Sequence, residues 1–337
     1  MASWRVDAGF IRSGKGGIRM KYNSRAWFRL GQSGAIFGMA APELREKYPL
    51  KILSADMSEP AGLGRYKGMY PDDFYNVGIA EQNLIGMSAG LASEGFKVVA
   101  EAQAAFITMR SFEQVRQYMG YMQFPIITVG INAGFALTYF GNTHYAIEDI
   151  ALMRQIPGMT VLSPADAGEA VKCFEAALEL NQPTYIRLTG GLQNPIVYKD
   201  DYDYTSGKLN CVFQGGNDVT IFATGSMVYQ SIEAAKLLLE EGIECRVVDV
   251  HTLKPFNRGQ VSAYADSKLI VTVEEHSVIG GLGAVIGESL TEERISNPLL
   301  KLGVNDSFSK VGDYDYLLQE HGLTAPHIAE SIKKALV

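Results

Sequence analysis

Glu81 is an acid at the beginning of an apolar stretch, residues 74–95, with the sequence FYNVGIAEQNLIGMSAGLASEG. From about Ala80 onward the apolar residues recur at helical spacing, and Gly95 closes the predicted helix. A helix this poor in charge is expected to be buried, and burying a carboxylate costs free energy unless the group is paired or used. An isolated acid at this position is most simply explained as one stabilised by the helix N-terminus.

Two further residues have types and positions that suit ligand binding. Asp56 closely follows residues 51–54, a predicted buried strand, and ligands gather at the carboxyl ends of strands in open α/β sheets. His144 ends the loop segment Gly141-Asn142-Thr143-His144. An imidazole there is either a solvated surface group or a hydrogen-bond donor and proton shuttle. Neither residue decides a chemistry by itself.

The residues around Glu81 indicate a function more specifically than its position at the start of a helix does. Residues 76–83, NVGIAEQN, resemble the thiamine-diphosphate glutamate motif of transketolases and 1-deoxyxylulose-5-phosphate synthases. The resemblance runs from about residue 25 to the end of the chain, in order and without large gaps. It continues through the segments 106–110 (FITMR), 141–144 (GNTH), 146–149 (AIED), 156–159 (IPGM), 163–166 (SPAD) and 185–187 (YIR). This continuity favours family membership far more than one motif does.

The resemblance implies a thiamine diphosphate site. In that family a carboxylate hydrogen-bonds the aminopyrimidine ring and favours its imino tautomer, while the carbanion chemistry belongs to the cofactor. Glu81 matches this acid, and Phe106 matches an aromatic residue that stacks on the ring. Gln103 stands where many transketolases carry a second Phe, which makes the predicted pocket more polar on that side. Asp56 is the fourth expected cofactor contact.

The same resemblance implies substrate contacts. His144 matches the histidine that lies at the reacting carbons of the family, and Arg187 matches an arginine that grips substrate phosphate. Arg29 is a second candidate for anion binding, and Arg25 competes with it because the alignment slides there.

Two departures from the family pattern lie near His144. Phe140 replaces an Asp that reads a sugar hydroxyl, and Asn132 replaces an upstream histidine. A phenyl ring cannot accept a hydrogen bond from a hydroxyl, so hydroxyl recognition must change or move. We therefore expect the reaction class to survive on a modified ketose donor or an unusual acceptor, for instance a deoxy or branched sugar.

A further part of the family pattern is missing. Transketolases hold the diphosphate and its Mg²⁺ with a Gly-Asp-Gly segment and a later Asn, and this chain contains no Gly-Asp-Gly. Magnesium needs an array of oxygen ligands, and no set of metal ligands is assigned here. The chain is therefore similar to the C-terminal subunit of a split transketolase. This predicts a partner chain that carries the diphosphate half and the metal, with two chains of each kind in a heterotetramer.

Short apolar strands alternate with helical patterns along most of the chain, which predicts an α/β fold with two doubly wound parallel-sheet domains. The predicted strands are 51–54, 97–101, 125–131, 160–163, 184–188, 218–223, 244–250 and 268–273. The predicted helices are 24–46, 80–95, 106–120, 147–154, 165–180, 227–241 and one after residues 280–283. We expect an N-terminal arm (1–20), a pyrimidine-binding domain (21–192), a polar linker (193–216) and a transketolase C-terminal domain (217–337).

The composition of the chain limits its possible partners and its cellular compartment. A net charge of −7 with no basic stripe argues against a nucleic-acid partner, and no apolar run reaches membrane-spanning length. The N-terminus lacks the apolar segment of a signal peptide. Cys173, Cys211 and Cys245 are widely separated and are expected to be reduced, buried thiols of a cytoplasmic protein.

Three alternatives remain at the level of the sequence. The β subunit of a 2-oxoacid dehydrogenase shares the two-domain plan and the glutamate, and a 1-deoxyxylulose-5-phosphate-synthase-like enzyme shares the motif. A non-catalytic assembly or regulatory subunit on the same fold is the third, since a fold does not fix a function. The intact Glu81, Phe106 and His144 favour the transketolase reading over this last alternative.

Overall fold

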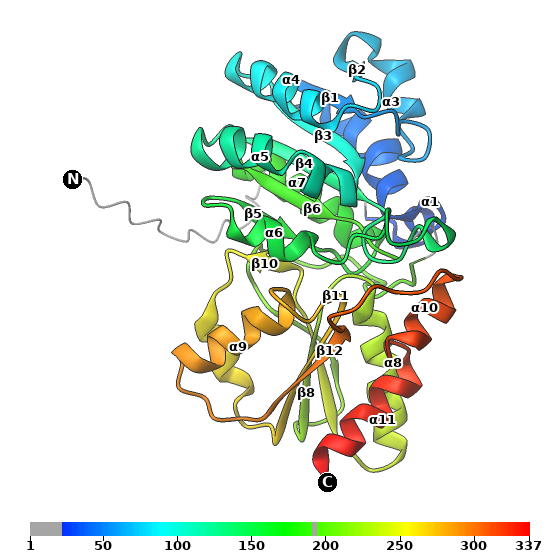
Figure 1. The fold of residues 1–337 in the computed structure, drawn as a ribbon, viewed down its shortest axis with the longest axis vertical. Coiled ribbons are helices and arrows are strands. Elements are labelled where there is room, and N and C mark those ends of the chain that lie inside the picture. Colours follow the sequence, from blue (N-terminus) through cyan, green and yellow to red (C-terminus); the bar gives the residue numbers. More distant parts are fainter. Residues whose placement is uncertain (1–21, 191–193) are drawn as a thin grey trace, which may run out of the picture.

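The computed structural model describes residues 22–190 and 194–337, which form two parallel-dominated sheets, one above the other in Figure 1. The first sheet has the strand order β10-β5-β6-β4-β3-β1-β2. Its strands are β1 (Leu50–Ser54), β2 (Phe74–Asn76), β3 (Lys97–Gln103), β4 (Ile126–Ile131), β5 (Thr160–Leu162), β6 (Thr184–Arg187) and β10 (Thr252–Lys254). The second sheet has the order β12-β11-β8-β9-β7. It contains β7 (Asn210–Gln214), β8 (Val219–Ala223), β9 (Cys245–Asp249), β11 (Leu269–Ser277) and β12 (Leu299–Val304).

Helices cover both faces of each sheet, and this arrangement confirms the predicted α/β class. The α-helices are α1 (Ser24–Gly34), α2 (Ala41–Leu44), α3 (Gly64–Met69), α4 (Glu81–Ser93), α5 (Phe112–Gln114), α6 (Asp149–Gln155), α7 (Ala167–Leu180), α8 (Met227–Glu240), α9 (Leu282–Glu292), α10 (Tyr314–Glu320) and α11 (Ala325–Leu336). Three π-helical segments are η1 (Ala35–Ala40), η3 (Phe106–Arg110) and η4 (Val115–Tyr121). The 3-10 segments are η2 (Pro71–Asp73), η5 (Thr138–Phe140) and η7 (Arg258–Tyr264).

Strands β7, β10 and β12 of the described chain are absent from the sequence prediction. β7 lies inside the expected linker and pairs antiparallel with β9, while β10 leaves the second half of the chain to pair antiparallel with β5 of the first sheet. The two predicted long helices, 24–46 and 106–120, are each broken by π-helical turns. Edge strands and helix irregularities depend on tertiary packing that a local pattern does not contain.

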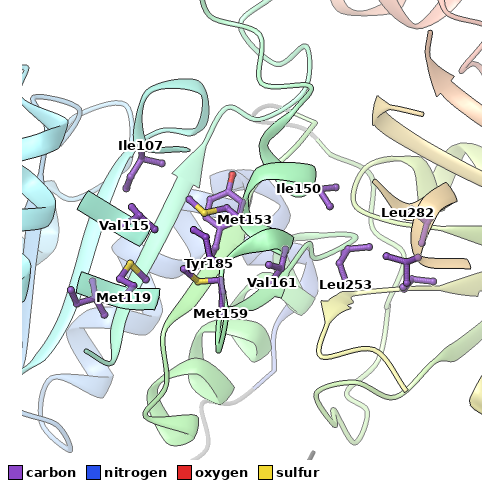
Figure 2. Packing of buried hydrophobic residues seen from close by; sticks show 14 of the residues in the cluster. Ile107, Val115, Met119, Ile150, Met153, Met159, Val161, Tyr185, Leu253 and Leu282 are labelled. Carbon is purple, nitrogen blue, oxygen red and sulfur yellow. The ribbon is translucent and has the colours of Figure 1, made fainter. Parts of the chain in front are cut away.

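One hydrophobic cluster runs through both halves of the molecule. Figure 2 shows Ile150 and Met153 of α6 together with Leu253 of β10 and Leu282 of α9, all part of the same group of buried side chains. The same cluster contains Ile107, close to the predicted cofactor side chain Phe106. Residues that position the site are therefore held by a core to which both sheets contribute.

The polar segment predicted as a linker is anchored to buried carboxyl groups. Tyr198 donates to Asp249 of β9 at 2.7 Å, and Tyr202 donates to Glu169 of α7 at 2.6 Å. The two tyrosine rings stack with centroids 4.1 Å apart. Burial raises the pKa of Asp249 to about 7.

Two remaining expectations concern the cysteines and the membrane. Cys173 and Cys245 are buried free thiols as expected, but Cys211 is exposed on the edge strand β7, so the expectation of burial is wrong for it. Among the described helices, none combines the length and apolar character needed to cross a bilayer.

Candidate active site

Glu81 begins helix α4, directly after the short strand β2 and the turn at residues 77–80. The residue is 2% exposed, as the apolar character of the helix predicted. Its Oε2 accepts a hydrogen bond from Arg110 Nη1 at 2.7 Å, which forms an ion pair between α4 and η3. The structure thus places a buried carboxylate at a helix N-terminus and against a cation, and both contacts compensate for the burial of the group.

Phe106 and His144 meet beside this ion pair. Their ring centroids are 5.2 Å apart in an edge-to-face arrangement, and the Arg110 guanidinium carbon lies 4.2 Å from the Phe106 centroid. His144 Nδ1 is 2.9 Å from Thr143 Oγ1, and Phe140 contacts the imidazole with centroids 5.0 Å apart. A continuous set of contacts therefore joins Glu81, through Arg110 and Phe106, to His144.

Gln103 and Asp56 lie at the carboxyl ends of the neighbouring strands β3 and β1. Gln103 Nε2 contacts Met57 Sδ at 3.7 Å, while its Oε1 is buried and has no hydrogen-bond partner within the described chain. Asp56 is exposed with a φ of 59°, and its Oδ1 accepts from Asn76 Nδ2 at 3.0 Å. Asn76 Oδ1 in turn accepts from the backbone of Asp56 and Gly78, which ties the Asp56 turn to the glutamate motif.

Glu101 is a buried acid near this site that the sequence analysis did not assign. Ser54 Oγ donates to its Oε2 at 2.7 Å, and its Oε1 is buried without a partner in the residues that the structure describes. Burial raises the pKa of Glu101 to about 8. Its position on β3, two residues before Gln103, was the only signal in the sequence.

A pocket of about 390 Å³ opens at the ends of β4 and β6. Its lining residues carry no formal charge: Gln32, Ser33, Pro60, Ile131, Asn132, Ala136, Leu137, Leu188 and Thr189. Asn132, a predicted substrate contact, is one of these lining residues and has a φ of 57°. Phe140 is 63% exposed and Arg29 is exposed on α1, three residues before the lining residue Gln32.

Arg187 is not among the residues that line this pocket, and its role in binding phosphate stays a prediction. The side chain is fully buried and its Nε donates to Asp149 Oδ2 at 2.8 Å. Its Nη2 donates to the backbone oxygens of Ala146 at 3.1 Å and Glu275 at 2.8 Å. A basic residue at a strand end looks the same in sequence whether it faces a ligand or a buried acid. Here the acid is Asp149, and the arginine joins the two sheets.

The described residues fit the aminopyrimidine end of thiamine diphosphate. A buried carboxylate, an aromatic face and the orphaned Gln103 Oε1 offer one acceptor for a ring nitrogen, one stacking surface and one further polar contact. No group of three or more His, Cys, Asp or Glu side chains that could hold a metal occurs in the described part of the chain.

Two domain families match this chain. The transketolase pyrimidine-binding domain matches residues 34–194, and the transketolase C-terminal domain matches residues 207–328. The chain belongs to the transketolase family. It is therefore a transketolase-type transferase, and membership implies dependence on thiamine diphosphate.

Individual relatives agree with this assignment. The chain is 39% identical over 282 residues to a 6-deoxy-6-sulfo-D-fructose transketolase subunit of Clostridium sp. (strain MSTE9), covering 83% of this chain and 86% of that protein. It is 34% identical over 289 residues to an apulose-4-phosphate transketolase subunit of Phocaeicola vulgatus, covering 85% of this chain and 91% of that protein. A solved structure described as a split gene transketolase, inactive beta4 tetramer, superposes with a TM-score of 0.81 at 39% identity and covers 91% of this chain and 98% of that one.

Proposed function

We propose that this chain is the C-terminal subunit of a cytoplasmic split transketolase that transfers a two-carbon ketol unit from a ketose to an aldose. The observation that carries the proposal is the buried Glu81 at the start of α4, with the Phe106 face and the His144 imidazole beside it. The partner subunit holds the diphosphate and Mg²⁺, and two chains of each kind form a heterotetramer. The names of the two relatives as transketolase subunits, and of the solved structure as a split gene product, support this division.

Each side chain has a distinct task in the proposed reaction. When bound, thiamine diphosphate supplies the carbon nucleophile and stabilises negative charge on the reacting carbon. Glu81 hydrogen-bonds the aminopyrimidine ring, and Phe106 provides the face on which that ring stacks. His144, half-buried at the mouth of the site, donates a hydrogen bond to a substrate oxygen or moves a proton there.

The proposed substrates are modified sugars. Phe140 beside His144 cannot accept a hydrogen bond from a sugar hydroxyl, and the 390 Å³ pocket is lined by uncharged residues that include Asn132. The two relatives are named for 6-deoxy-6-sulfo-D-fructose and apulose 4-phosphate. The exposed Arg29, three residues before the lining residue Gln32, is the candidate of this chain for binding an anionic sugar terminus.

Reconstitution with the diphosphate-binding chain tests the proposal. We expect ketol transfer only when both chains, thiamine diphosphate and Mg²⁺ are present, measured across a panel of ordinary, deoxy, sulfonated and branched ketoses. Glu81→Gln should lower kcat by a factor of about 100 or more, because the ring loses its carboxylate partner. Glu94→Gln, at the other end of α4, is the matched control and should be unchanged. Activity of this chain alone, or an active Glu81→Gln variant, would refute the proposal.

A further inference from the structure

Arg110 is a cation at the candidate active site. Neither the glutamate motif nor the names of the matching families assign this residue a role. Its side chain is 45% exposed, whereas the Glu81 side chain that it contacts is 3% exposed. The contact is made by one guanidinium nitrogen to one carboxylate oxygen, Nη1 to Oε2, at 2.7 Å. Arg110 thus holds one oxygen of the Glu81 carboxylate, Oε2.

The arginine is fixed at both ends. Its guanidinium lies on the Phe106 ring, with Cζ 4.2 Å from the centroid. Its backbone oxygen accepts a hydrogen bond from Gln82 Nε2 at 3.2 Å, and Gln82 directly follows Glu81. Stacking on an aromatic face and a backbone tether both reduce the freedom that a long exposed side chain would otherwise keep.

The π-helical segment η3 explains how Arg110 reaches both groups. Residues four apart lie on one face of a helix, so Arg110 stands over Phe106 at the two ends of the same short segment. Thr108, between them, donates to Ala104 O at 2.6 Å and faces the buried side. Isolated π-helical turns occur frequently at functional sites. The distortion thus places the aromatic face and the cation side by side, next to the start of α4.

We propose that Arg110 is a positioning residue that orients the Glu81 carboxylate for the aminopyrimidine ring. By holding Oε2 it directs Oε1 to the ring nitrogen, and by covering one face of Phe106 it leaves the other face for the ring. This inference rests on the proposed function, because it concerns the same cofactor site. The exposed pair of Arg116 and Glu113, also in this region of the chain, is the contrasting case of an ion pair with no such task.

Arg110→Met, Arg110→Lys and Arg116→Met in the reconstituted enzyme test the inference. Methionine keeps the apolar stem and removes the charge and the donor. For Arg110→Met we expect kcat to fall by about tenfold or more, with the Kd for thiamine diphosphate within about threefold of wild type, since a misdirected carboxylate affects reaction more than binding. The near-ultraviolet circular dichroism of the bound cofactor should change in the same variant. Arg110→Lys should retain part of the activity, and low concentrations of guanidinium ion should partly restore Arg110→Met.

The outcomes separate this inference from the proposed function. Loss of activity in Glu81→Gln together with wild-type kcat and dichroism in Arg110→Met would overturn the inference and leave the function intact. Tighter cofactor binding by Arg110→Met at unchanged kcat would also overturn it, because Arg110 would then obstruct the ring. An equal loss of activity in Arg116→Met would indicate damage to the segment rather than to the carboxylate and would count against a positioning role. An active Glu81→Gln enzyme would instead defeat the proposed function itself.

Discussion

Two buried carboxyl groups near the site, those of Glu81 and Glu101, differ in the contacts that compensate for their burial. Glu81 is paired with a cation, whereas Glu101 has one serine donor and an unpartnered second oxygen. Burying a carboxyl without a cation favours the neutral form. The two buried acids therefore differ, since Glu81 has a cationic partner and Glu101 has none among the described residues.

Glu101 makes the stability of the chain depend on pH. Burial raises its pKa to about 8 in the folded protein, above the roughly 4.3 of an unfolded glutamate. The folded state thus keeps a proton that the unfolded state releases, so the stability from this carboxyl is complete below pH ~4.3 and is lost as the pH rises through about 8. We expect Glu101→Gln, which stays neutral, to match wild type near pH 5 and to exceed it above pH 8 by on the order of 1–3 kcal/mol. Urea unfolding at a series of pH values measures this difference, and a constant gap between the two proteins would contradict it. The exposed Glu113→Gln is the control.

At the level of helices and strands, the sequence predicted most elements but not how they pair. The alternation of strands and helices, the helix that begins at Glu81 and the burial of Glu81 itself follow from local patterns and are confirmed. The edge strands β7 and β10 were missed because their pairing partners are distant in sequence. The contact of the buried Arg187 with Asp149 was missed for a related reason, since Asp149 lies 38 residues away. Local pattern predicts an element, whereas the partner of a side chain depends on the packing of several elements.

The loop that carries His144 is held by the second half of the chain. Asn142 Nδ2 donates to Ser309 O at 2.7 Å, and Ser309 N donates to Asn142 Oδ1 at 3.1 Å. Ser309 Oγ also lies 2.6 Å from Nε2 of His321, whose pKa is lowered by burial. His321 stacks on Phe135 of the same loop with centroids 5.1 Å apart. The C-terminal half thus contributes to the site by fixing the loop rather than by entering it.

Removing the two hydrogen bonds between Asn142 and Ser309 should lower kcat without unfolding the chain. Asn142→Ala takes away two hydrogen bonds two residues before His144, so we expect the imidazole to lose its fixed position and kcat to fall about tenfold. The Kd for thiamine diphosphate should stay near wild type, because Glu81 and Phe106 are untouched. Kinetics of the reconstituted enzyme and the thermal midpoint of this chain measure the two effects. Asn305→Ala, an exposed asparagine of the neighbouring loop, is the matched control, and an unchanged kcat in Asn142→Ala would contradict the expectation.

At the scale of the whole molecule, residues from both halves of the chain form the junction between the two sheets. Strand β10 from the second half completes the first sheet, and Leu253 of that strand is 1% exposed inside the cluster that also contains Met153. The buried Arg187 links Asp149 to the backbone of Glu275 on β11. Breaking this junction would expose apolar surface and leave a buried charge unpaired, so the halves are expected to unfold together.

Leu253→Ala tests this cooperativity with a probe in the other half of the chain. The cavity left by a buried leucine costs about 2–4 kcal/mol, and unfolding should shift by the same amount for every probe if the chain unfolds in one step. Trp27 is buried in the first half, and a Trp4→Phe background makes it the single tryptophan. We expect Trp27 fluorescence and far-ultraviolet circular dichroism to report the same lowered urea midpoint. Leu239→Ala, at an exposed position of α8, should change the midpoint by less than about 0.5 kcal/mol. If the urea midpoint from dichroism falls while the midpoint from Trp27 fluorescence stays unchanged, the two halves unfold separately. The contacts that hold the His144 loop could then open without loss of the Glu81 site.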